Sequence, residues 1–213
     1  MSNGILRDRR VFIAVMALLL AAACSGAGGS GEWATLPPAP APEQLDQLAP
    51  VWDNERANAA LDVRIYLEVY CREPACLDYL RESAPALIAA PDARVRIYDY
   101  PLSQTGKSFL FAGVGRCVAL KNPDAYLEFL RLAIDLPDRY DNNVEMQRIS
   151  KSAIGEYNTR CIHAETRKLQ AAFENRNPLG FSQTPATIIQ GRLIYGARPA
   201  QAWAALLQQA REN

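Results

Sequence analysis

The chain has 213 residues, of which 23 are basic and 23 acidic, and 49% are hydrophobic. Its balanced charge, without a cluster of Lys and Arg, excludes the basic footprint of a nucleic-acid-binding domain. The sequence also contains no Gly-rich phosphate loop, no catalytic carboxylate pair and no Ser-His-Asp arrangement, so we expect neither those chemistries nor a cofactor.

Residues 1–23 have the pattern of a secretory signal peptide. Arg7, Arg9 and Arg10 precede a run, residues 11–23, that has no charged or polar side chain. A membrane-spanning helix needs about 20 apolar residues, so this run is too short to span and predicts export. Without it the chain keeps 20 basic and 22 acidic residues, a net charge near −2.

The signal ends in Ala21-Ala22-Ala23-Cys24, which resembles the lipobox of bacterial lipoproteins. This resemblance implies that Cys24 is acylated, and several acyl chains would hold the protein at a membrane. The alternative is ordinary cleavage after Ala23, which leaves Cys24 as a free thiol. We therefore expect a bacterial cell-envelope lipoprotein that faces the periplasm, with the outer membrane favoured over the inner by Ser25.

Residues 24–50 change composition abruptly. A Gly/Ser-rich stretch, 25–31, is typical of flexible coil, and the Pro-rich stretch 37–42 favours extended polyproline II. We expect a flexible tether here, followed by one domain at residues 51–213.

The elements expected in the domain follow from its periodicities. Residues 63–69 alternate apolar and polar positions and predict a strand that runs into Cys71. A helix follows over 76–90, and a second strand over 95–100. Residues 106–174 show several helical periods. Strands at 186–190 and 193–195 form a hairpin, and a final helix begins at Pro199. The predicted order is β, α, β, helical block, β, β, α, an α/β fold.

This order, with cysteines where the first strand turns into a helix, resembles the DsbA-like thiol:disulfide oxidoreductases over residues 60–211. The resemblance implies a thioredoxin-like fold with an inserted α-helical subdomain at about 103–178. Glu68 lies near the family's usual acidic position, and Thr184-Pro185 resembles its cis-proline segment, beside which a substrate chain can pair. An ordinary trans proline at a strand edge is the alternative.

The cysteine spacing departs from the family, because four residues separate Cys71 and Cys76 where the family has two. If the first cysteine is aligned, Cys71 is the attacking thiol, favoured as thiolate by the helix N-terminus, and Cys76 resolves the mixed disulfide. If the second is aligned, Glu73 replaces the attacking thiol. We prefer the first alignment, since the preceding strand then falls into register. A plain stabilising disulfide is the competing interpretation of the pair.

Once Cys24 is assigned to lipid, four cysteines remain and allow three pairings. The family resemblance implies that Cys117 and Cys161 form a structural disulfide within the helical insertion; two buried free thiols are the alternative. No metal site is expected, because His163 is the only histidine and has no motif linking it to the cysteines.

Two functions follow from these residues. The first is an envelope thiol:disulfide oxidoreductase that exchanges disulfides with exported proteins through Cys71 and Cys76 and is served by an unidentified redox partner. The second is a non-catalytic, membrane-anchored module that binds proteins beside Pro185. The cysteine pair favours the enzyme, and its unusual spacing favours the module.

Overall fold

The core of the protein is a five-stranded sheet with the strand order β1-β3-β2-β4-β5. The computed structural model describes residues 32–70, 73–136, 142–174 and 177–213, and Glu32–Asn213 form one compact unit. The strands are β1 (Trp52–Asp53), β2 (Leu61–Leu67), β3 (Ala93–Asp99), β4 (Ala186–Ile189) and β5 (Arg192–Tyr195). The predicted order of elements is confirmed, with the two-residue strand β1 as an addition.

Strand β2 is the central strand, and it pairs with one strand on each side. It pairs in parallel with β3, where Leu61 lies opposite Ala93, and antiparallel with β4, where Tyr66 lies opposite Ala186. Strand β5 closes the hairpin with β4, and β1 pairs antiparallel with β3 at the opposite edge. Apolar and β-branched residues fill the interior positions of these strands because both faces of the sheet are covered.

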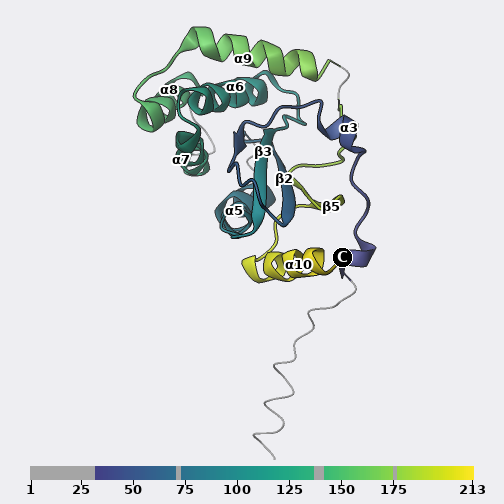
Figure 1. Cartoon of the computed structure of the whole chain (residues 1–213). Coiled ribbons are helices and arrows are strands. Elements are labelled where there is room, and N and C mark those ends of the chain that lie inside the picture. The colour runs from purple at the N-terminus through teal and green to yellow at the C-terminus, as the bar shows by residue number, and fades with distance from the viewer. Residues whose placement is uncertain (1–31, 71–72, 137–141, 175–176) are drawn as a thin grey trace, which may run out of the picture. The chain divides into compact units, whose positions relative to one another are not determined.

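Helices lie on two sides of the sheet (Figure 1). On one side, α4 (Pro74–Asp78), a π-helical segment η1 (Tyr79–Ser83) and α5 (Ala84–Ile88) follow one another without a break. The C-terminal helix α10 (Ala200–Glu212) contacts both η1 and α5. The predicted helix over 76–90 is therefore present, although its middle turn is π-helical.

The helical block, which lies beyond one end of strands β2 and β3 in Figure 1, consists of α6 (Gly106–Lys121), α7 (Pro123–Ile134), α8 (Asn142–Ile154) and α9 (Thr159–Ala172). Side-chain caps begin three of these helices, from Thr105, Asn122 and Asn158. Helices α6 and α9 pack closely at Gly113, where a Cβ atom would lie 2.2 Å from Oγ1 of Thr166. This block fills the predicted insertion at 103–178.

Residues 32–50 correct the expectation of a flexible tether. They include two short helices, α2 (Glu32–Thr35) and α3 (Pro42–Leu45), and their large apolar side chains are buried. The backbone between the helices pairs with the sheet edge, since Ala39 N donates to Gly191 O at 2.8 Å and Leu193 N donates to Pro37 O at 2.9 Å. Burial of Trp33 and these edge hydrogen bonds hold the segment against the domain, and the extended preference of the prolines is compatible with pairing at a sheet edge. The expected signal peptide at 1–23, Cys24 and the tether portion 24–31 lie outside the described residues.

Within the described part of the chain, none of the helices combines the length and apolarity that crossing a bilayer requires.

Candidate thiol–disulfide site

Cys76 lies in the first turn of α4, just beyond the end of the central strand. Glu73 is the extended N-cap of this helix, and its carbonyl accepts hydrogen bonds from the N–H groups of Cys76 and Leu77. Pro74 at the first helical position suits the helix start because proline has no N–H to satisfy. Cys76 is only 3% exposed and is disulfide-bonded. The predicted attacking residue, Cys71, lies outside the described residues.

The structure brings Cys76 and the Thr184-Pro185 segment together. Strand β4 begins at Ala186, opposite Tyr66 near the end of β2, so the preceding proline lies where the chain leaves β2 for the cysteine helix. Sγ of Cys76 is 3.7 Å from the carbonyl oxygen of Thr184. The Thr184-Pro185 peptide bond is cis, the isomer that the family resemblance implies. Pro185 O in turn accepts a 2.9 Å hydrogen bond from Gly196 N, which ties the segment to the hairpin.

Two buried contacts, which the sequence patterns did not predict, hold the cysteine helix against the C-terminal half of the chain. The hydroxyl groups of Tyr79 and Thr187 are hydrogen-bonded, and both residues are fully buried. Burial raises the pKa of Tyr79 well above its usual value, so the phenol stays protonated. One turn later, Ser83 Oγ donates to the carbonyl of Arg198 and accepts from its N–H. These contacts fix the position of Cys76 relative to Pro185.

Glu68, the acidic residue noted in the sequence, lies directly after β2. Its carboxylate accepts hydrogen bonds from Ser103 N at 3.0 Å, from Ser108 Oγ at 2.6 Å and from the Ser103 hydroxyl. Ser108 also completes the Thr105 cap of α6. Glu68 therefore joins the end of the central strand to the start of the helical insertion.

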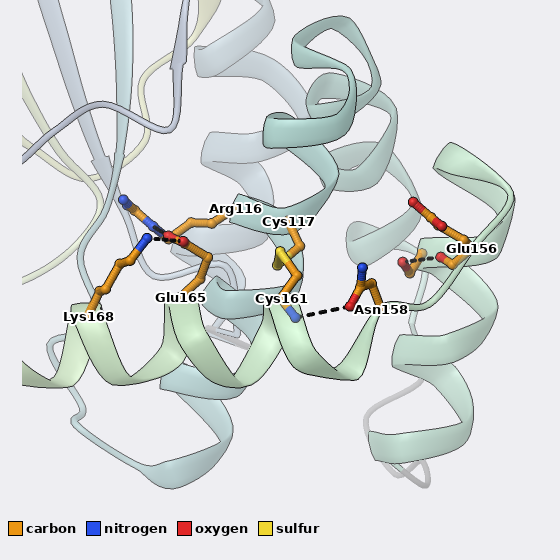
Figure 2. Close-up of a disulfide and its surroundings, with 8 residues drawn as sticks. Arg116, Cys117, Glu156, Asn158, Cys161, Glu165 and Lys168 are labelled. Carbon is orange, nitrogen blue, oxygen red and sulfur yellow. Dashed lines mark hydrogen bonds and ion pairs between the residues drawn. A yellow bond between two sulfur atoms is a disulfide. The ribbon is translucent and has the colours of Figure 1, made fainter.

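Cys117 and Cys161 form a disulfide with an S–S distance of 2.02 Å, which is the pairing implied by the family resemblance. Figure 2 shows that it bridges two helices, α6 and α9. Cys161 lies in the first turn of α9, where its N–H donates to Oδ1 of Asn158. Because its two cysteines come from different helices of the insertion, this disulfide links the two ends of the subdomain. Both cysteines are far from Cys76 in the sequence.

A buried charge cluster next to this disulfide was not predicted from the sequence. Arg116 donates to Glu165 at 3.2 Å and lies 3.7 Å from Oδ2 of Asp99; Lys168 also donates to Glu165 (Figure 2). Burial raises the pKa of Asp99 to about 6, although Arg116 and the hydroxyl of Tyr126 oppose this. Burial acts in the same direction on Glu165, but hydrogen bonds from Lys168 and Arg116 prevail and lower its pKa.

Metal ligands are not gathered anywhere in the described residues, where no three His, Cys, Asp or Glu side chains form a cluster suited to an ion. His163 is exposed on α9.

No protein-family model and no curated protein matches the sequence. Solved structures do match. The catalytic domain of Proteus mirabilis ScsC is 21% identical with a TM-score of 0.59, and the match covers 79% of this chain and 95% of that one. A periplasmic thioredoxin-like protein from Salmonella enterica serovar Typhimurium is 19% identical with a TM-score of 0.61, over 81% and 98% of the two chains.

The thiol-disulfide exchange protein α-DsbA2 from Wolbachia pipientis is 17% identical, with a TM-score of 0.62, over 80% of this chain and 90% of that one. Each of these likenesses covers about four fifths of this chain. The predicted fold class is confirmed: the chain has a thioredoxin-like fold with an inserted α-helical subdomain, in the arrangement of DsbA-like proteins.

Proposed function

We propose that the protein is an envelope thiol:disulfide oxidoreductase that exchanges disulfides with exported proteins through Cys71 and Cys76. The observation that carries this proposal is the 3.7 Å approach of the Cys76 sulfur to the carbonyl oxygen of Thr184, the residue before Pro185. A purely stabilising disulfide has no need of a proline segment from the opposite half of the chain. The fold likeness supports the same chemistry, since a matching structure is described as a thiol-disulfide exchange protein.

The proposed reaction divides the work between the two sulfurs. The Cys71 thiolate attacks a disulfide of the exported protein, which forms a mixed disulfide and releases one substrate thiolate. The Cys76 thiolate then attacks the Cys71 sulfur, releases the second substrate thiolate and leaves a Cys71–Cys76 disulfide. Two electrons pass from the protein to the substrate, and the reverse sequence oxidises a substrate dithiol. Because Cys76 is 3% exposed, it suits the resolving step, which takes place within the protein.

Thr184 and Pro185 are proposed to bind the substrate chain beside the reacting sulfurs. Thr184 is half-buried and its carbonyl contacts Cys76, whereas Pro185 has no N–H to pair with neighbouring backbone. An extended substrate segment can pair with the backbone of Thr184, as in other cases of strand addition. Such main-chain contacts accept many sequences, which suits exchange with different exported proteins.

We further propose that Cys24 carries lipid and holds the domain at a membrane, on the periplasmic side and more readily at the outer than the inner membrane. The support is the signal pattern and the Ala21-Ala22-Ala23-Cys24 sequence. The Cys117–Cys161 disulfide agrees with export, because such bonds persist in oxidising compartments. Mass spectrometry of the N-terminus from the native host tests this, and an unmodified Cys24 would refute it.

The test of activity is reduction of insulin and disulfide transfer to a reduced peptide, with the wild type, Cys71→Ala and Cys76→Ala compared. Both single variants should lose turnover. A double variant, Cys117→Ala with Cys161→Ala, is the matched control and should retain turnover at a temperature where it is folded. A wild type without activity in either direction contradicts the proposal.

The alternative is a non-catalytic module that uses the surface beside Pro185 to bind proteins. One observation favours it: four residues separate the cysteines where DsbA-like proteins have two. An inactive wild type whose binding of exported proteins survives replacement of both Cys71 and Cys76 by Ala supports the module.

A further inference from the structure

A groove of about 540 Å³ lies between the cysteine helix and α7. One wall comes from η1 and α5, and the other from α7, which contacts η1 and lies near α5 in Figure 1. The volume falls within the range of about 300–1,000 Å³ that is typical of small-molecule sites. The side chains that line its interior are predominantly aliphatic: Leu80, Ala84, Ile88, Leu127, Leu130 and Ile134.

The aliphatic side chains form a continuous strip because they recur every three or four residues on both helices. On α7 the strip runs from Leu127 to Ile134, a rise of about 10 Å. A strip of this length between two helices fits one alkyl chain. The volume of the groove is too small for the two chains of a phospholipid.

In the part of the chain that the structure describes, the rim of the groove offers one cation to a ligand. Arg131 is already engaged, since it donates to Glu128 at 2.6 Å and lies 3.8 Å from Asp135. Arg81 is exposed and lines the same groove, and it makes no ion pair with any residue that the structure describes. A guanidinium group at an apolar rim is suited to a carboxylate, which it can bind through two parallel hydrogen bonds.

The groove is distinct from the surface beside Pro185, because the two lie on different sides of one helix. Tyr79 and Ser83 point toward β4 and the segment before α10, whereas Leu80, Arg81 and Ala84 line the groove with α7. The π-helical turn η1 supplies Tyr79 and Ser83 to one side, and Leu80 and Arg81 to the other. Short π-helical segments within helices are frequent at functional sites.

We propose that this groove binds a single-chain fatty acid, with its alkyl chain along the aliphatic strip and its carboxylate on Arg81. Among the described residues that line the groove, Arg81 is the one unengaged cation, which matches a monoanion, and the length of the strip and the volume of the groove match one chain. The proposal goes beyond thiol exchange and does not depend on it, since none of the described residues that line the groove is a cysteine.

The test is isothermal titration of the full chain with dodecanoate and, separately, with uncharged 1-dodecanol, both below their aggregation limits. Arg81→Glu should weaken dodecanoate binding about tenfold or more, the size expected for loss of a charge-assisted pair, and should leave dodecanol binding unchanged. Arg167→Glu is the matched control: Arg167 is exposed on α9, away from the groove, and should have no effect on either ligand.

A second variant tests the aliphatic strip. Ala89→Trp places a bulky side chain at an exposed position of the groove rim, so both ligands should lose binding about tenfold or more while circular dichroism shows a folded protein. Three results overturn the proposal: no binding of dodecanoate to the wild type, equal binding to wild type and Arg81→Glu, or binding unaffected by Ala89→Trp. Binding of an amphipathic Leu/Glu helical peptide without binding of dodecanoate also overturns it, in favour of a protein partner.

Discussion

The sulfur of Cys76 lies 3.7 Å from the carbonyl oxygen of Thr184, although 108 residues separate the two along the chain. The approach depends on the sheet, because β4 starts beside the end of β2, and on the hydrogen bond between Tyr79 and Thr187, which ties the cysteine helix to β4.

The Tyr79–Thr187 contact should be measurable as a coupling energy. Tyr79→Phe leaves the buried Thr187 hydroxyl without its partner, so we expect the free energy of unfolding to fall by about 1–3 kcal/mol. Adding Thr187→Val removes the orphaned hydroxyl and should recover most of this loss. Urea denaturation of the two single variants and the double variant provides the measurement, and strictly additive losses would show that the two hydroxyl groups are not coupled.

The buried carboxyl of Asp99 predicts an unusual pH dependence of stability. Its pKa is raised by burial to about 6 in the folded protein, against an ordinary value of 3.8. The folded state therefore holds the proton more tightly than the unfolded state, and this group's contribution to stability is lost as the pH rises from about 4 to 6. The loss is about 3 kcal/mol for a shift of this size.

Asp99→Asn isolates that effect, because the amide does not titrate and its oxygen can still accept from Tyr126. The free energy of unfolding of the variant minus that of the wild type should be larger at pH 7 than at pH 4.5. Urea denaturation at both pH values gives the two differences, and a difference that does not change with pH would contradict the assignment to Asp99.

The Cys117–Cys161 disulfide should contribute to stability and not to turnover. The bond spans 44 residues of sequence, so removing it with Cys117→Ala and Cys161→Ala should lower the free energy of unfolding by about 3–4 kcal/mol in the chain-entropy model. Guanidinium denaturation without reductant is the measurement. An unchanged midpoint would mean that the bond adds no constraint to the unfolded chain.

Trp33 distinguishes a packed segment from a tether. Its side chain is 5% exposed, and its backbone N–H donates to Oε1 of Gln209 in α10 at 3.0 Å. Trp33→Ala should therefore cost about 3–5 kcal/mol, as for other buried aromatic residues. Thr35→Ala in the same short helix removes an exposed side chain and should change the thermal midpoint little. Equal midpoints for the two variants would favour a tether.

Most of the architecture could be predicted from the sequence, because strand and helix periodicities are strong where one face is buried. The first half of strand β2 shows this, since Val63 and Ile65 are fully buried and Arg64 between them is partly exposed. Farther along the strand the alternation ends, because Tyr66 on the other face is fully buried too. Strand β1 could not be predicted, since two residues carry no period. The π-helical turn was also missed, because Leu80 and Ala84 are spaced equally well for an α-helix.

The segment 32–50 was misjudged for a physical reason. Its prolines and the neighbouring glycines are typical of linkers, but Trp33, Leu36, Leu45 and Leu48 are buried. These four large apolar residues were the feature of the sequence from which packing against the domain could have been predicted. The pairing of Pro37 and Ala39 with the edge of β5 was not available from composition, since backbone hydrogen bonds leave no trace in side-chain patterns.

Of the candidate site, the sequence predicted Cys76, Thr184 and Pro185, which the structure brings close together, and the Cys117–Cys161 pair, which forms a disulfide. It did not identify Asp99, Arg116 and Glu165 as a cluster, because charged residues with no motif look like surface residues until burial is known. Cys71 remains a prediction, and the function depends on it.

Capture of mixed disulfides tests that prediction most directly. Purified Cys76→Ala, in the reduced state, is mixed with an exported protein that contains a disulfide, and the products are separated without reductant and mapped by mass spectrometry. We predict a covalent adduct joined through Cys71, which persists because the resolving thiol is absent, and no adduct with Cys71→Ala. If Cys76→Ala forms no adduct, or if Cys71→Ala forms as much as Cys76→Ala does, Cys71 is not the attacking thiol and the proposed exchange mechanism is wrong.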